Sequence, residues 1–175
     1  SCSNVELNNY PKEVKAVEVE KPVETQNFEL LSFAKQVAKE DGNKYPQYLL
    51  GILFQESKFC TTKGFRVSGP PKSKYFGCGQ IKLTPAKHVI IKYPELKKYL
   101  ETDTDEELQA KLILDDKFNI RIASKYLMLM EINKNPDKAI TAYNLGKEGS
   151  SKVNPSTHKY TQLVKSHVKN VKKTV

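Results

Sequence analysis

One glutamate of this chain occupies an unusual position for a charged residue. The segment Pro46–Cys60 reads PQYLLGILFQESKFC, and its proline suits the first turn of a helix. On such a helix Leu49, Leu53 and Glu56 share one face, because residues three, four and seven positions apart are neighbours. A charge beside an apolar stripe is unfavourable unless it is paired, protonated or open to a cleft. Glu56 is therefore the first candidate for chemistry.

A carboxyl group in an apolar wall can act as a general acid. Burial raises the pKa of carboxyl groups, and the protonated form can then donate to a leaving group such as a glycosidic oxygen. Most glycosidases use two carboxylates, whereas one acid suffices when the substrate supplies its own nucleophile. Four aspartates that could supply a second carboxylate are explained as helix-start residues: Asp103, Asp105, Asp115 and Asp116. The alternative for Glu56 is a surface position on a last turn that rotates outward.

Other kinds of catalytic site have less support. The three histidines, His88, His158 and His167, fall on expected helices where structural roles suffice. No pair of histidines or carboxylates has the spacing of metal ligands on one helix. The Gly77–Gly79 segment lacks the preceding strand and the third glycine of a phosphate-binding loop. We expect neither a metal nor an organic cofactor.

Length and charge narrow the class of protein. The chain has 175 residues, enough for one domain, and its net charge of +9 favours an anionic partner such as a cell-wall polymer or a lipid surface. Only Arg66 and Arg121 among the 29 basic residues are arginines, which disfavours nucleic-acid recognition. The longest apolar run, Tyr48–Phe54, is too short to span a bilayer. We expect a monomer that does not bind nucleic acid.

The pattern of apolar residues predicts a mainly α protein. Residues 1–27 alternate Glu, Lys, Val and Pro and are typical of an extended tether, and residues 28–175 form one helical domain. Residues 61–76 lack periodicity, so a long loop or a small hairpin should follow the helix of Glu56. Helices are expected at about 28–41, 46–59, 84–93, 104–114, 116–130, 136–144 and 157–171, with a turn at 94–100.

The three cysteines favour one disulfide. Cys60 and Cys78 flank the region of Glu56, and a bond between them would add about 3 kcal/mol on the loop-entropy model. Two buried free thiols in a reducing compartment are the alternative. Cys2 is then left over, either as the acylated cysteine of a bacterial lipoprotein or as an ordinary cysteine near the start.

Three segments together resemble a known family. Glu56-Ser-Lys-Phe59, then Gly77-Cys-Gly-Gln-Ile81 with Thr84-Pro-Ala86, then Ala139-Ile-Thr-Ala-Tyr-Asn-Leu-Gly146, occur in the order of the three signatures of the soluble lytic transglycosylase (SLT) domain. Asn119–Leu127 is similar to the helix before its third signature. The resemblance covers roughly residues 28–170 and implies a goose-type lysozyme-like fold.

The resemblance implies a role for each matching residue. Glu56 would be the sole catalytic acid/base. Substrate-binding positions would be Ser57, Ser68 (with Ser73 as the alternative), Gln80, Ile81, Tyr143, Asn144 and Tyr160. Core packing is the alternative for Tyr143. The pair Cys78–Gly79 departs from the family, which has a bulky apolar pair there, and this would loosen the lining of the cleft.

The expected function is that of a peptidoglycan lytic transglycosylase. Such an enzyme cleaves the MurNAc–GlcNAc β-1,4 bond of glycan strands and leaves a 1,6-anhydro-MurNAc end. We expect an exported protein of the periplasm or cell envelope, with anchoring as an outer-membrane lipoprotein if Cys2 is lipidated. The alternatives are a lysozyme- or chitinase-type hydrolase on the same fold, and a non-catalytic wall-binding or secretion-scaffold protein.

Overall fold

The expected mainly α class is confirmed. The computed structural model describes residues 23–63 and 74–174, and only the backbone of residues 23–27 and 170–174. These parts contain no strand. Their helices are α2 (Val23–Glu40), α3 (Pro46–Ser57), α4 (Leu83–Lys92), the 3-10 helix η2 (Pro94–Tyr99), α5 (Asp105–Leu114), α6 (Asp116–Leu129), α7 (Pro136–Ser150) and α8 (Lys159–Thr174).

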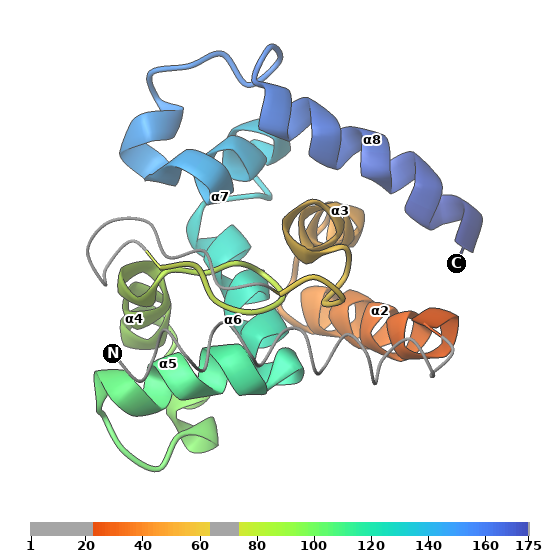
Figure 1. Ribbon diagram of the computed structural model, residues 1–175. Coiled ribbons are helices and arrows are strands. Elements are labelled where there is room, and N and C mark those ends of the chain that lie inside the picture. The colour runs from red at the N-terminus through yellow and green to blue at the C-terminus, as the bar shows by residue number, and fades with distance from the viewer. Residues whose placement is uncertain (1–22, 64–73, 175) are drawn as a thin grey trace.

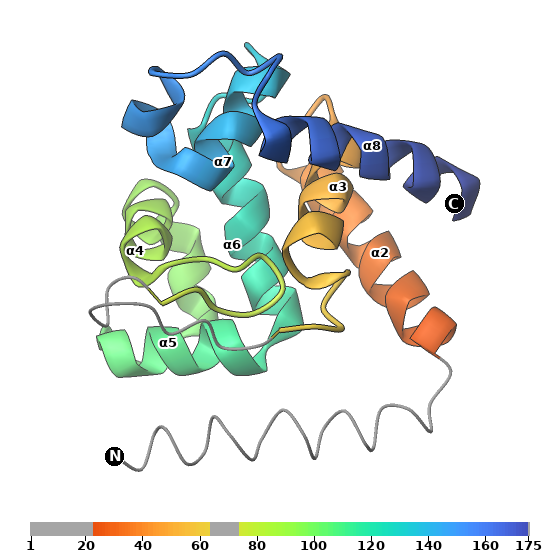
Figure 2. The ribbon, with the colours of Figure 1, turned by 45° about the horizontal axis from the view of Figure 1, so that its top comes forward.

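Two helices organise the packing. Helix α3 contacts α2, α6, α7 and α8, and α6 contacts α2, α4, α5 and α7 as well (Figure 1). Figure 2 shows α8 crossing α3 on the side away from α5. Leu49, Ile52 and Leu53 of α3 are completely buried, as their shared stripe predicts. The helix that carries Glu56 is thus enclosed along most of its length.

Gly51 lets α8 approach α3 closely. A Cβ atom at this position would lie 2.7 Å from the carbonyl oxygen of Val164 and 3.2 Å from a methyl group of Val168. Any side chain there would push the two helices apart. The close contact holds the first turns of α8 beside the end of α3.

Local sequence signals account for most helix starts. The side chains of Thr104, Asp115 and Asn135 accept hydrogen bonds from backbone N–H groups in the first turns of α5, α6 and α7, as N-cap residues do. Pro46 and Pro136 begin their helices. These helix starts were predictable because each depends on neighbouring residues alone.

Several helix bounds differ from the sequence-based ones, and three of the differences are informative. Helix α2 begins at Val23, within the segment expected as a tether, and α4 begins at Leu83, so Thr84 is in its first turn instead of capping it. Gly146 has a φ of 79° and kinks α7, which continues to Ser150 instead of ending there. A glycine with positive φ commonly ends a helix, but here the chain resumes a helical path after it.

Most of the segment expected as a long loop or a small hairpin, residues 61–76, lies outside the described residues, and a compact turn follows it. Phe76 and Ile81 form an isolated antiparallel bridge, and we call residues 76–81 the glycine turn. The predicted disulfide between Cys60 and Cys78 is present and ties this turn to the end of α3. Lys63 Nζ lies 2.7 Å from Asp116 Oδ1 and joins the same region to α6. Across the described parts, no helix has the length and apolar content needed to cross a membrane.

Candidate active site

Glu56 is hydrogen-bonded to a tyrosine from the last helix. It lies in the final turn of α3, partly buried, and the hydroxyl of Tyr160 in α8 donates to its Oε2 atom over 2.7 Å. The sequence placed both residues in the site but not in contact with each other. The contact depends on how α8 crosses α3, which local pattern does not determine.

Two tyrosine hydroxyls beside Glu56 are held in the protonated form. Burial, and then the negative charge of Glu56, keep the pKa of Tyr143 and of Tyr160 well above the ordinary value for tyrosine. The ring of Tyr126 lies 5.3 Å from that of Tyr143, and burial raises the pKa of Tyr126 as well. Both hydroxyls therefore keep their protons at neutral pH, where Tyr160 donates to Glu56 and Tyr143 donates to the carbonyl of Gly79.

Ser57 supports the site from within. Its side chain is completely buried, and its hydroxyl donates to the carbonyl of Cys78 over 2.7 Å and accepts from the N–H of Cys60 over 2.8 Å. The residue expected to line the cleft beside Glu56 therefore contacts backbone and has no exposed surface. It links the end of α3 to the glycine turn.

Asn119 of α6 is a site residue that sequence reasoning did not single out. Its Oδ1 accepts from the N–H of Gly79 over 2.8 Å, and its Nδ2 donates to the carbonyls of Phe76 and Leu112, each over 2.9 Å. The side chain is completely buried, and all three bonds are to backbone. The signal was available, because Asn119 is a polar residue in line with Ile122 and Tyr126 on one helix face.

Hydrogen bonds from two side chains hold both the N–H and the carbonyl of Gly79. Asn119 holds its N–H, and the hydroxyl of Tyr143 donates to its carbonyl over 2.7 Å. A Cβ atom at Gly79 would lie 2.6 Å from the Tyr143 hydroxyl oxygen, so a side chain would displace Tyr143. Cys78 and Gly79 are both buried, so the departure from the family pattern gives a tightly held turn instead of a loosened lining.

A pocket of about 150 Å³ lies beside the glycine turn. Four of the predicted substrate-binding residues line it: Gln80, Ile81, Tyr143 and Asn144. Tyr75, Lys82 and the kink of α7 at Gly146 complete much of its wall. The structure thus brings together residues from three separate parts of the sequence around one pocket.

The polar side chains of this pocket already have partners within the protein. Gln80 donates from Nε2 to the carbonyl of Gly77 over 2.9 Å, and its φ of 49° is left-handed. Asn144 is exposed and lies 2.9 Å from Nε2 of His158 through its Oδ1 atom. A ligand would use the second donor of the Gln80 amide and the exposed amide of Asn144.

The remaining sequence-based candidates are placed as follows. Ser68, Ser73 and Cys2 lie outside the described residues. Asp103 and Asp105 are exposed at the start of α5, where Asp105 pairs with Lys87 over 3.0 Å. Neither aspartate lines the pocket beside the glycine turn.

The structure also contains a group of atoms with the proximity of metal ligands. The sulfurs of Cys60 and Cys78 and a carboxylate oxygen of Asp116 lie within 4.8 Å of one another. The two sulfurs are bonded to each other, so they do not offer the thiolates that bind metals. This group therefore acts as a covalent link with a neighbouring ion pair.

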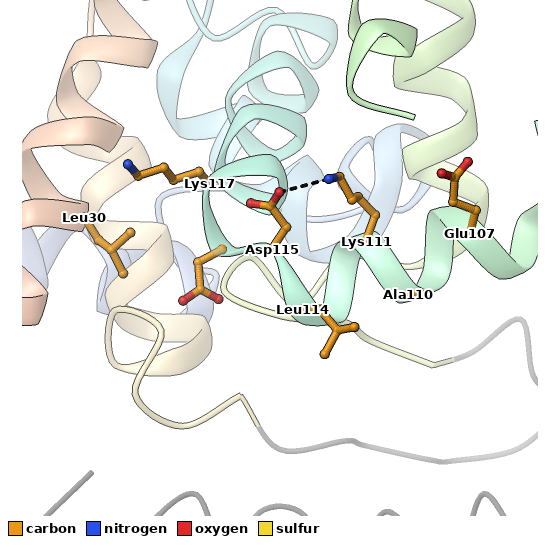
Figure 3. A pocket seen from close by; sticks show the side chains of 8 residues that line it. Leu30, Glu107, Ala110, Lys111, Leu114, Asp115 and Lys117 are labelled. Atoms are coloured by element: carbon orange, nitrogen blue, oxygen red, sulfur yellow. Dashed lines mark ion pairs between the residues drawn. The ribbon is translucent and has the colours of Figure 1, made fainter. Parts of the chain in front are cut away.

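A larger pocket of about 580 Å³ lies between α2, α5 and the start of α6. Figure 3 shows Leu30 of α2 and Leu114 of α5 at its wall, with Lys111 and Asp115 joined by an ion pair of 3.2 Å. None of the residues predicted to bind substrate lines this pocket.

No protein-family model, curated protein or solved structure matches this chain. Its function is therefore inferred from the chemistry of the site and from the three sequence motifs.

Proposed function

We propose that this protein is a peptidoglycan lytic transglycosylase with a lysozyme-like fold and Glu56 as its single acid/base. The observation that carries the proposal is the pair formed by Glu56 and Tyr160, in which a neutral hydroxyl fixes one oxygen of a partly buried carboxyl group. Residues of the second and third motifs line the pocket beside the glycine turn, which Glu56 does not line, and the charge of Glu56 acts on Tyr143 in the wall of that pocket.

In the proposed reaction, the acid form of Glu56 first protonates the glycosidic oxygen between MurNAc and GlcNAc. The bond from this oxygen to C1 of MurNAc breaks, and an oxocarbenium-like centre develops there, which the N-acetyl group of the same sugar can shield. The Tyr160 hydroxyl donates to the carboxylate that Glu56 has become. Tyr143 lies in the wall of the pocket and holds the backbone of Gly79 in place.

Glu56 then acts as the base. It takes the proton from the C6 hydroxyl of the same MurNAc residue, and this oxygen bonds to C1. The two reacting atoms belong to one sugar, which gives the closure a large proximity advantage over attack by a free water. The product is a 1,6-anhydro-MurNAc end, lighter by one water than the hydrolytic product. The glutamate returns to its acid form, so no other proton donor is required.

Several features support an extracytoplasmic site of action. The disulfide between Cys60 and Cys78 is of the kind that forms in oxidising compartments. The net charge of +9 suits an anionic polymer such as the cell wall. We propose glycan strands of peptidoglycan as the partner and the periplasm or cell envelope as the location.

The deciding experiment compares Glu56→Gln with wild type on purified peptidoglycan. The substitution keeps the size of the side chain and removes the transferable proton, so release of soluble fragments should fall to background. Glu106→Gln, at an exposed position of α5, is the matched control and should act like wild type. Circular dichroism and thermal melting establish that both variants are folded.

Mass spectrometry of the digest then distinguishes the candidate reactions. Anhydro-MurNAc ends as the main product support the transglycosylase. Reducing MurNAc ends would identify a hydrolase on the same scaffold, and Asp103 and Asp105 would be the first positions to test for a second carboxylate. Absence of any fragment release by the wild-type protein would favour a wall-binding or scaffold role. Near wild-type release by folded Glu56→Gln would refute the proposed role of Glu56.

A further inference from the structure

A second polar pocket lies on another side of the molecule. Its volume is about 140 Å³, and α2, η2 and α6 form its walls. Arg121 and Lys125 of α6 line it, whereas Asn119 and Tyr126 of the same helix face the proposed active site. Tyr126, which lines the pocket beside the glycine turn, lies about 140° around the helix from Arg121 and about 100° from Lys125, so the two pockets use different faces of α6.

Arg121 is positioned by aromatic rings. The centre of its guanidinium lies 5.0 Å from the ring of Phe33 in α2 and 5.1 Å from the ring of Tyr99 in η2. Cation–π contacts of this kind involve the positive charge and do not use the N–H groups as donors to an oxygen, so these donors stay available. The rings restrict the side chain before any ligand arrives, which lowers the entropy lost on binding.

The N–H donors of Arg121 have no acceptor among residues 23–63 and 74–174. Among the residues that the structure describes, it forms no ion pair and no hydrogen bond, and its two ring contacts are its interactions. Its neighbour Lys125 differs, since its Nζ lies 3.1 Å from Asp41 and 3.7 Å from Glu95. The five N–H groups of this guanidinium, at the wall of the pocket, are therefore available for hydrogen bonds to a ligand.

The charges around the pocket leave one positive charge in excess. Lys98, Arg121 and Lys125 line it together with two carboxylates, Asp41 and Glu95. Lys125 bridges both carboxylates, and Ser124 donates to Asp41 as well. Lys98 is exposed, and its ammonium lies 5.2 Å from the ring of Tyr99, near Arg121. A singly charged anion would balance the site.

We propose that this pocket binds the carboxylate group of a small molecule or of a peptide end. The two parallel N–H groups of Arg121 would hold the two carboxylate oxygens in the fork geometry that arginine favours. Lys98 adds attraction from the rim. A phosphate dianion matches less well, because its second charge would face Asp41 and Glu95. The site does not depend on Glu56, so it stands or falls independently of the proposed catalysis.

The small number of arginines makes the test direct. Arg66 and Arg121 are the only arginines in the chain, so the side-chain Nε–Hε region of a nitrogen-15 NMR spectrum should hold two signals. An Arg66→Lys variant leaves the signal of Arg121 alone. This signal is followed while N-acetyl-dialanine, its C-terminal amide, acetate or inorganic phosphate is added at constant ionic strength.

A saturable shift of the Arg121 signal with N-acetyl-dialanine, and none with the amide, is the expected result. Acetate alone will bind equally well if the pocket recognises only the carboxylate, and more weakly if it also contacts the peptide. Arg121→Lys should weaken binding at least tenfold, read from the backbone signals of η2, because the ammonium lacks the fork. Lys98→Gln should weaken it several-fold, whereas Lys138→Gln on the exposed surface of α7 should not.

Three results would overturn the proposal. The first is no saturable shift of Arg121 in the Arg66→Lys protein. The second is an equal shift with the amide, which would show that the carboxylate is not recognised. The third is tighter binding of phosphate than of the carboxylates. If Arg121→Lys does not fold, the comparison of Lys98→Gln with Lys138→Gln and the direct Arg121 signal still decide the question.

Discussion

The hydroxyl of Tyr160 and the carboxylate of Glu56 are separated by 104 positions in the chain and by 2.7 Å in space. The contact joins the last helix to the helix at the centre of the fold. It gives the proposed acid/base a fixed orientation that α3 alone does not provide. The predictions below start from this pair and then concern the residues that hold the glycine turn.

Replacing Tyr160 with phenylalanine should lower activity without removing it. The ring stays, and the hydrogen bond to a charged group is lost, which corresponds to about 1.5–3 kcal/mol, or roughly a 10- to 100-fold drop in kcat on peptidoglycan. Initial rates of fragment release at saturating substrate measure this. An unchanged kcat in Tyr160→Phe would show that the contact plays no part in the reaction.

The buried tyrosines should make stability fall in alkaline solution. The folded protein keeps the protons of Tyr126, Tyr143 and Tyr160 because their pKa values are raised, mainly by burial. The unfolded chain loses them at about pH 10. Above that pH the unfolded state binds fewer protons, so the free energy of unfolding decreases by up to about 1.4 kcal/mol per pH unit for each such tyrosine. Below pH 10 this contribution is fully present.

Tyr143→Phe provides the measurement for this effect. Urea unfolding of wild type and variant between about pH 9 and about pH 11 gives two slopes of stability against pH. The free energy of unfolding of the variant should fall less steeply with pH, because one proton fewer is retained by the folded state relative to the unfolded state. Equal slopes for wild type and Tyr143→Phe would contradict the burial of this hydroxyl.

Asn119 should be important for both stability and activity. In Asn119→Leu, a substitution of similar volume, the N–H of Gly79 and the carbonyl of Leu112 lose the bonds from this side chain, whereas the carbonyl of Phe76 keeps its bond from the N–H of Ile81. Each unsatisfied buried group costs about 1–3 kcal/mol, so we expect a loss of about 3 kcal/mol or more. For a chain of this size that corresponds to a fall in Tm of about 6 °C or more.

A second asparagine offers a matched comparison. Asn133 also bonds to two backbone groups, the N–H of Lys44 and the carbonyl of Gly42, but these bonds are exposed to solvent. Asn133→Leu should therefore lower Tm by only a few degrees, because water can replace the lost partners. Similar melting temperatures for the two variants would show that the buried bonds of Asn119 carry no special weight.

Loss of the disulfide should destabilise the fold and disturb the site. The double variant Cys60→Ala, Cys78→Ala removes a bond across 18 positions, for which the loop-entropy model gives about 3 kcal/mol. Cys60 ends a run of three residues, Lys58 to Cys60, with left-handed φ values of 47°, 57° and 71°. Such a run is unfavourable for residues other than glycine, so the disulfide helps to maintain it. Urea midpoints and fragment release are the measurements.

Cys2→Ser controls for the removal of a thiol, since it leaves the disulfide intact. It should match wild type in both measurements. The same destabilisation should appear when the wild-type protein is reduced before unfolding. A double variant as stable as wild type would mean that the buried contacts of Phe59, which is completely buried, hold this region by themselves.

The sequence predicted those parts of the fold that depend on neighbouring residues. Pro46, Thr104, Asp115 and Asn135 begin their helices through their own side chains and backbone, so the helix order and most bounds could be inferred. The pairing of Cys60 with Cys78 followed from their position around Glu56. The kink at Gly146 was harder, because a glycine with positive φ can end a helix or bend it.

The roles of the site residues were less accessible from sequence. Ser57 and Asn119 hold the glycine turn through bonds to backbone groups that are 21 and 40 positions away. The helix face of Asn119 could have marked it as a buried polar residue, but the partners of both side chains follow from how the helices cross, which no local pattern reports. The reason for a glycine at position 79 is visible only in the structure, where a Cβ atom would collide with the hydroxyl of Tyr143.

The crossing of α8 over Gly51 has a consequence for biosynthesis. Helix α3 leaves the ribosome about a hundred residues before α8, which at typical rates of translation is an interval of about 5–20 s. During that time the surface of α3 around Gly51, which later receives Val164 and Val168, is uncovered. A nascent chain with such a surface is a natural client for a holding chaperone. The chain would leave the chaperone only after α8 has been made and has packed on α3, and the hydrogen bond of Glu56 forms at that stage.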